Sequence, residues 1–185
     1  MSNKQRIFYK VMHIISVIAI VLNIIGVLFL FLSWFMNAAG KAASYEIEAG
    51  VLSFAIPENL VEDGFAVTPL FFITSIVLSG AILVLLFNTM KIFSNLKKQA
   101  IFIPKNASYI RNIGWMVIIL SVIKNIPEFI QIWGLRNQMD SIMNVSFSVV
   151  YELDFGLLFS GLSILAIALI FKQAVKIAEE NQLTI

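Results

Sequence analysis

The chain of 185 residues is 59% hydrophobic and only 13% charged, and its mean hydropathy is +0.91. An ordinary soluble domain carries about twice that share of charged residues, so this composition indicates a membrane protein. The net charge is only +2, and the absence of cysteine excludes disulfides, thiolate metal sites and a thiol nucleophile.

Four long apolar stretches divide the chain, and each reaches or approaches the ~20 residues that a helix needs to cross ~30 Å of hydrocarbon. Backbone polar groups in lipid must be satisfied within the segment, which favours helices over strands. The expected fold is an all-α integral membrane protein, a single domain over 1–185 built as a four-helix bundle. Its predicted parts are spans 11–36, 67–93, 108–133 and 153–176, outer loops 37–66 and 134–152, and an inner loop 94–107.

The basic residues predict the orientation of the four spans. They gather before the first span, between the second and third, and after the fourth, whereas the other two loops are mainly acidic. Short loops rich in Lys and Arg stay in the cytoplasm, so both termini are expected to be cytoplasmic, and the lipid bilayer is the first partner. The basic set is Lys4, Arg6, Lys10, Lys91, Lys97, Lys98, Lys105, Arg111, Lys172 and Lys176.

Two short segments of the first outer loop have the character of strands. Residues 45–49 alternate apolar and acidic side chains, and 51–56 is rich in strand formers before Pro57. A β-hairpin is expected here, and the alternation at 145–149 would add a third strand to make a small extracytoplasmic cap. The alternative is an irregular loop that dips into the headgroups, and the sequence leaves both open.

Small residues in the second and fourth spans allow two helices to approach closely, as small-xxx-small contacts do. We interpret them as packing positions, with a ligand-binding face as the alternative. They are Thr74, Ser75, Ser79, Gly80 and Ala81 in the second span, and Gly156, Ser160, Gly161 and Ser163 in the fourth.

The inner loop combines basic and apolar residues. The second span is expected to continue as a helix to about Lys98, Pro104 breaks the chain, and Asn106 is the candidate N-cap of the third span. Three roles for the cations of this loop remain open. They only set the topology, they bind anionic headgroups, or they dock a cytoplasmic partner. The apolar run 101–103 favours interfacial burial or docking over free solvation. The candidate cytoplasmic contact is Lys97, Lys98, Phe102, Lys105 and Arg111.

Polar residues inside the third span suggest a second site. An ionisable residue at that depth is a functional hypothesis by default, and Lys124 and Glu128 share a face there at i,i+4. Pro127 lacks an N–H and frees the carbonyl of Ile123, so the helix is expected to open. The candidate intramembrane polar site is Lys124, Asn125, Glu128, Asp154 and Asn23.

Three interpretations of that polar site remain open. Lys124 snorkels outward to Glu128, Asp154 or headgroups and only fixes helix packing, or the residues line an outward-facing pocket for a small ligand or ion. The third interpretation is a conducting pathway, which would need polar residues at successive depths on several helices.

The sequence offers little to an enzyme. His13 is the only histidine and has no acid, cysteine or second histidine within helical reach. Neither a phosphate-binding glycine loop nor a Gly-x-Ser-x-Gly elbow occurs. We therefore expect no catalytic residue, no cofactor and no metal site. Direct nucleic-acid binding is not expected either, because the chain lacks a basic soluble surface with interleaved aromatic residues.

Three short segments carry a family resemblance. Phe102 followed by Asn106, the run Ile-Arg-Asn-Ile-Gly-Trp at 110–115, and the chain end 171–185 resemble the bacterial domain-of-unknown-function family 2975. The family's usual glycine in the position of Ala174 is missing, and the outer loops have no match. The resemblance implies a small four-span protein of the bacterial cytoplasmic membrane, often encoded beside a small helix-turn-helix repressor, and it brings no catalytic residues.

The leading functional hypothesis is a membrane-bound sensor or regulatory partner of a cytoplasmic protein, such as a helix-turn-helix repressor. It follows from the segregation of charge between the two sides and from the resemblance. The alternatives are a small transporter or channel subunit, expected to be a homo-oligomer at this size, and protection against a membrane-active peptide or toxin.

Overall fold

The computed structural model describes residues 3–38, 45–49, 52–56, 69–130, 133 and 151–182. Four helices in this part of the chain are long and apolar enough to cross a membrane, which confirms the prediction of a four-helix, multi-pass membrane protein. They are α1 (Asn3–Ala38), α2 (Pro69–Lys97), α3 (Pro104–Ile123) and α5 (Phe155–Gln182). The apolar segment that includes α3 continues past its end, to Ile130.

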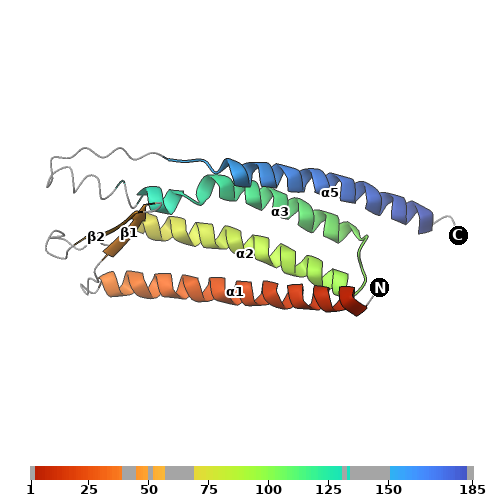
Figure 1. The fold of residues 1–185 in the computed structure, drawn as a ribbon, viewed down its shortest axis with the longest axis horizontal. Coiled ribbons are helices and arrows are strands. Elements are labelled where there is room, and N and C mark those ends of the chain that lie inside the picture. Colours follow the sequence, from red (N-terminus) through yellow and green to blue (C-terminus); the bar gives the residue numbers. More distant parts are fainter. Residues whose placement is uncertain are drawn as a thin grey trace.

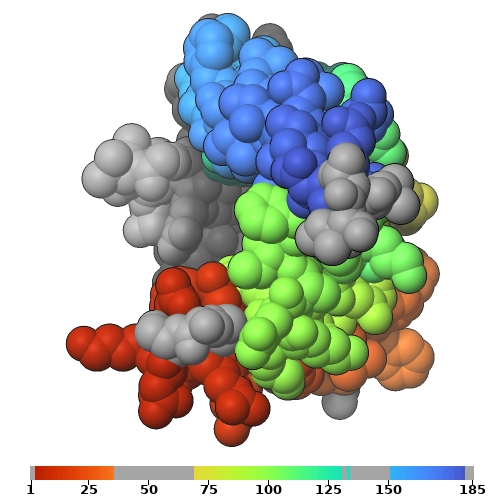
Figure 2. Space-filling view, turned by 90° about the vertical axis from the view of Figure 1, so that its right-hand side faces the viewer, coloured from red at the N-terminus to blue at the C-terminus, as the bar shows by residue number. Residues whose placement is uncertain are grey.

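The four helices lie in an open row (Figure 1). In the described residues α1 packs on α2, α2 on α3 and α3 on α5, and no substantial contact between α1 and α5 closes a bundle. The same order from α1 to α5 is visible from the end of the row in Figure 2. The start of α1, the α2–α3 connection and the end of α5 share one end of the row, which we call the N/C end.

The two strands expected in the first outer loop are present. β1 (Tyr45–Ala49) pairs antiparallel with β2 (Leu52–Ile56), with Tyr45 opposite Ile56 and Ala49 opposite Leu52. They lie at the end of the row opposite the N/C end (Figure 1). A cap on the outer side of the membrane stays a prediction, and the third strand at 145–149 lies outside the described residues.

The third span is interrupted where Pro127 predicts. α3 ends at Ile123, residues 124–125 form a turn, and helical geometry resumes over 126–130. The backbone N–H of Lys124 still donates to the carbonyl of Leu120, at 3.1 Å, and that of Phe129 donates to Asn125, at 2.9 Å. The opening therefore leaves the carbonyls of the last turn of α3 without their ordinary helical donors.

Two glycines bring α3 and α5 into close contact. A Cβ atom at Gly161 would lie 2.6 Å from Ile118 Cγ1 and 3.0 Å from the carbonyl oxygen of Gly114. A Cβ atom at Gly114 would lie 2.8 Å from Leu165 Cδ2. Side chains larger than hydrogen do not fit at this crossing, which is the small-residue packing found between membrane helices. Gly80, also predicted to be a packing position, differs from these two because nothing lies within 4 Å of the equivalent atom.

Candidate functional site

At the end of the row away from the N/C end, the segment before α5 closes the opened end of α3. The backbone N–H of Asp154 donates to the carbonyl of Ser121 at 3.2 Å, and the Tyr151 hydroxyl donates to the carbonyl of Val122. The side-chain amide of Asn125 donates in turn to the carbonyl of Glu152 at 2.7 Å. Carbonyls released by the opening thus find donors from the next helix, and we call this set of contacts the polar clamp.

An ion pair completes the polar clamp. Lys124 Nζ donates to Asp154 Oδ2 at 2.5 Å, while the other carboxylate oxygen of Asp154 accepts from the backbone N–H of Leu157 at 2.8 Å. Asp154 therefore caps the N-terminus of α5 and neutralises Lys124 at the same time. It precedes the span that begins at Phe155. The Lys124 hydrogen bond, followed by that of Leu157, lowers the pKa of the Asp154 carboxyl below its ordinary value.

The polar clamp contains only part of the predicted intramembrane polar site. Lys124, Asn125 and Asp154 come together, whereas Glu128 is exposed and makes no ion pair within the described residues. Asn23 lies elsewhere, because its Oδ1 accepts a hydrogen bond of 2.9 Å from the Ser79 hydroxyl between α1 and α2. Of the predicted carboxylate partners for Lys124, the structure selects Asp154.

At the N/C end, α2 stops in a Schellman motif. The backbone N–H of Ala100 donates to Asn95 and that of Gln99 donates to Leu96, both at 3.0 Å. Gln99 has φ 64°, a left-handed conformation that glycine usually occupies. The predicted helical extension to about Lys98 agrees with the observed end at Lys97. The connection to α3 is therefore an ordered turn.

Asn106 holds this turn in place. Its side chain is only 1% exposed, and its amide group donates to the carbonyls of Ala100 and Ile101, at 2.8 Å each, while its Oδ1 accepts from the Asn95 amide at 2.7 Å. The prediction that Asn106 is the N-cap of the third span is wrong. Pro104 occupies the first turn of α3, so the cap position falls on Ile103, which makes no side-chain hydrogen bond.

The ordered turn displays most of the predicted cytoplasmic contact. Lys97, Lys98 and Lys105 are exposed around it, and Phe102 is 54% exposed although it stacks on Phe171 of α5, with ring centroids 5.7 Å apart. We call these four residues, Lys97, Lys98, Phe102 and Lys105, the basic turn. The Phe102–Phe171 stack brings the basic turn into contact with α5.

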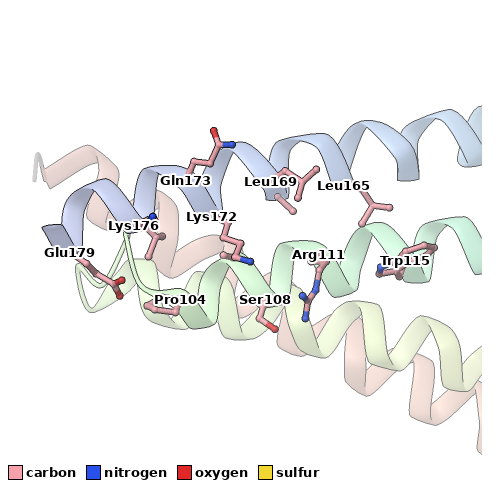
Figure 3. A pocket seen from close by; sticks show the side chains of 13 residues that line it. Pro104, Ser108, Arg111, Trp115, Leu165, Leu169, Lys172, Gln173, Lys176 and Glu179 are labelled. Atoms are coloured by element: carbon pink, nitrogen blue, oxygen red, sulfur yellow. The ribbon is translucent and has the colours of Figure 1, made fainter.

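Arg111 lies apart from the basic turn. It belongs to a groove of about 740 Å³ between α3 and α5, together with Lys172 and Lys176 (Figure 3). The sequence prediction assigned those two lysines to topology alone. Their i,i+4 spacing was visible in the sequence, but their apposition to Arg111 depends on the rotation of α5 against α3.

His13 on α1 is half-buried, and its buried Nδ1 has no hydrogen-bond partner among the residues that the structure describes. Among the residues that the structure describes, no group of three or more His, Cys, Asp or Glu side chains is placed to hold a metal ion. Neither observation adds a candidate for catalysis.

A family model described as "Protein of unknown function (DUF2975)" matches residues 54–185, which agrees with the resemblance stated above. The match includes β2 in part, α2, α3 and α5, and begins after α1. No curated protein and no solved structure matches the chain.

Proposed function

The chain belongs to the DUF2975 family of proteins of unknown function, and we propose that it is a membrane-bound regulatory partner of a cytoplasmic protein. The observation that carries this proposal is the basic turn. Its backbone is held by Asn106 and its aromatic ring by Phe171, yet its charged groups and much of Phe102 remain exposed.

A rigid turn of this kind suits protein recognition. Binding of a preorganised surface loses less conformational entropy than binding of a mobile loop, and an aromatic anchor inside a polar rim is a common arrangement at protein interfaces. The complementary partner is a protein with an acidic surface around an apolar recess. A helix-turn-helix repressor held at the membrane by its non-DNA-binding face is the partner class that the family resemblance suggests.

In this proposal the polar clamp is the part of the protein that responds to a ligand or to a change in the membrane. It joins the end of α3 to the start of α5 at one end of the row, and the stack of Phe102 on Phe171 joins the turn before α3 to α5 at the other. A change at the clamp that shifts α5 along α3 would therefore move Phe171 against the basic turn. In this proposal both termini are cytoplasmic and the clamp faces outward, in accord with the distribution of basic residues.

The test is genetic and uses the full chain in its native membrane. Deletion of the gene should change transcription of a defined set of genes, and wild-type protein should restore it. A variant carrying Phe102→Ala, Lys97→Gln and Lys98→Gln should reach the membrane in normal amounts and fail to restore transcription.

The matched control is Lys4→Gln with Lys10→Gln, which removes two exposed cations from α1 at the same end of the row. It should restore transcription fully. Deletion without any transcriptional change, or equal failure of the control, would refute the proposal. A solute flux in reconstituted liposomes that disappears with Lys124→Met would instead favour the transporter.

A further inference from the structure

The groove between α3 and α5 is basic at one end. Arg111 comes from α3, and Lys172 extends from α5 toward the part of α3 where Ser108 and Arg111 lie (Figure 3). Lys176 lies one turn further along α5, near the N/C end. Three cations from two helices therefore line one groove, and like charges are brought near one another only at some cost.

These charges are incompletely neutralised. Glu179 is the single carboxylate that lines the groove. Lys176 Nζ lies 3.6 Å from Glu180, which does not line it. Within the described residues neither Arg111 nor Lys172 takes part in an ion pair. The N-terminus of α3, which begins with Pro104 at the same end of the groove, adds the partial positive charge of a helix dipole.

The other end of the groove is apolar and exposed. Trp115 is 52% exposed and Leu169 is 64% exposed, and Leu165 lies between them on the α5 side. Trp115 is four residues, or about 6 Å along the helix, from Arg111 in the direction of the membrane centre. The groove therefore changes from cationic to apolar along the membrane normal, over the distance that separates a phospholipid phosphate from its acyl chains.

We propose that this groove binds an anionic phospholipid of the leaflet on the side of the two termini. Arg111 and Lys172 hold the phosphate, the Ser108 hydroxyl donates to one of its oxygens, and an acyl chain lies along Trp115, Leu165 and Leu169. Arg is suited to this role because its planar fork forms paired hydrogen bonds with phosphate oxygens. Basic pockets between helices on the cytoplasmic side of a membrane are the usual form of such sites.

The lipid site does not depend on the regulatory role. It involves Arg111, Lys172 and Lys176, whereas the docking surface proposed above is the basic turn, and the two sets share no residue. A lipid that bridges α3 and α5 would stabilise their contact, since a ligand that binds only the folded state adds to its stability.

The experiment compares lipids on the purified full chain in neutral detergent micelles, with bound lipid counted by native mass spectrometry. Dioleoyl phosphatidylglycerol should be retained at least tenfold more strongly than dioleoyl phosphatidylcholine. Arg111→Gln and Lys172→Gln should each weaken retention of the anionic lipid about fivefold, and the double variant more than tenfold.

The control is Lys4→Gln with Lys10→Gln, which removes the same charge from the exposed surface of α1 at the N/C end and should leave retention within twofold of the wild type. Circular dichroism and the unfolding temperature without lipid check that each variant is folded. Equal retention of the two lipids would overturn the proposal, as would an equal loss in the control, because charge alone would then explain binding.

A third arm separates a lipid from a free anion. Inorganic phosphate at 100-fold excess over the lipid should displace little phosphatidylglycerol, because it gains nothing from the apolar end of the groove. Trp115→Ala should weaken the lipid severalfold. Complete displacement by phosphate, or no effect of Trp115→Ala, would show a site for small anions and overturn the lipid assignment.

Discussion

The two halves of the helix row are held together in different ways. Between α3 and α5 the backbones approach so closely that Gly114 and Gly161 leave no room for a methyl group, and the polar clamp joins their ends. Between α1 and α2 the contact is made by side chains, with the Ser79–Asn23 hydrogen bond in the middle and Phe72 packed on Phe31 and Trp34. Gly26 and Gly80, the glycines of that half, have open space where a Cβ would lie.

Burial within the chain is greatest in the third span and least in the first. In the apolar window of Pro104–Ile130 28% is buried within the chain, whereas the share is 11% in both α2 and α5 and only 6% in α1. Lipid must cover the rest of α1, and lipid tails are as apolar as leucine, so α1 gains little free energy from its neighbour. The family match begins at residue 54 and so covers the closely packed half and leaves out α1.

The largest effect is expected at the joint between the two halves. Asn106→Ala removes three hydrogen bonds from a buried site and leaves the carbonyls of Ala100 and Ile101 without a donor. Roughly 3 kcal/mol of stability should be lost, since each abandoned buried group costs about 1 kcal/mol or more. Thermal unfolding in detergent measures this. Asn112→Ala is the control, because its side chain makes no hydrogen bond within the described residues, and an equal effect there would contradict the assigned role.

Gly161→Ala should cost somewhat less, about 2 kcal/mol, because the added methyl meets backbone atoms of α3 that cannot rotate away. Gly80→Ala is the matched change in the other half. There the methyl has space and alanine is the better helix former, so stability should stay the same or rise slightly. Unfolding midpoints of the two variants measure the contrast between the halves directly. A similar loss of stability in both variants would show that the two halves are packed alike.

A smaller effect is expected for the ion pair of the polar clamp, because Lys124 is partly exposed. Lys124→Met and Asp154→Asn should each destabilise the α3–α5 contact, and the double variant should lose less than the sum of the two. Glu128→Gln, which removes a neighbouring exposed carboxylate, should have no effect. A strictly additive double variant would mean that the two groups do not interact.

The ion pair of Lys124 and Asp154 should also make the stability of the protein depend on pH. The folded-state pKa of Asp154 is lowered, so its contribution is present above the ordinary carboxyl pKa and is lost as the pH falls through the folded value. The Asp154→Asn variant should therefore differ from the wild type at neutral pH and approach it under acid conditions. Unfolding midpoints measured at both pH values test this, and a difference that grows in acid would contradict the assignment.

The smallest effect belongs to the α1–α2 half. Ser79→Ala removes the hydrogen bond to Asn23 and should cost only about 0.6 kcal/mol, the average for such bonds between membrane helices. Ser163→Ala is the control, because that hydroxyl donates to Phe159 in its own helix. A loss of several kcal/mol at Ser79 would show that α1 is held more firmly than its low burial indicates.

Several structural features followed from the sequence because they depend on a residue and its near neighbours. The interruption after Ile123 is one, since Pro127 cannot donate to that carbonyl in any surroundings. The end of α2 at Lys97 is another, whereas the two strands were one of two alternatives that the sequence left open. The prediction for Asn106 failed because its residue type and position indicated an N-cap. In the structure its side-chain amide donates to two carbonyls of a turn that forms only in the folded chain.

Partners distant in the chain were less predictable. Glu128 and Asp154 were both plausible neighbours of Lys124, and the choice of Asp154 depends on where the chain enters α5. The Tyr151 hydroxyl meets Val122, 29 residues away, only because α3 opens at that carbonyl. The groove of Arg111 and Lys172 was missed for the same reason. Those two residues are 61 positions apart, and the sequence around either one does not indicate the other.

The number and membrane character of the helices were determined by the sequence alone, because the transfer of an apolar segment into lipid is a sum over its own residues. The order of the helices in an open row, the glycine crossing of α3 and α5, the partner of Lys124 and the basic groove were decided by the tertiary structure. Each depends on how a helix is rotated about its axis, which follows from many weak contacts between helices and from no single residue.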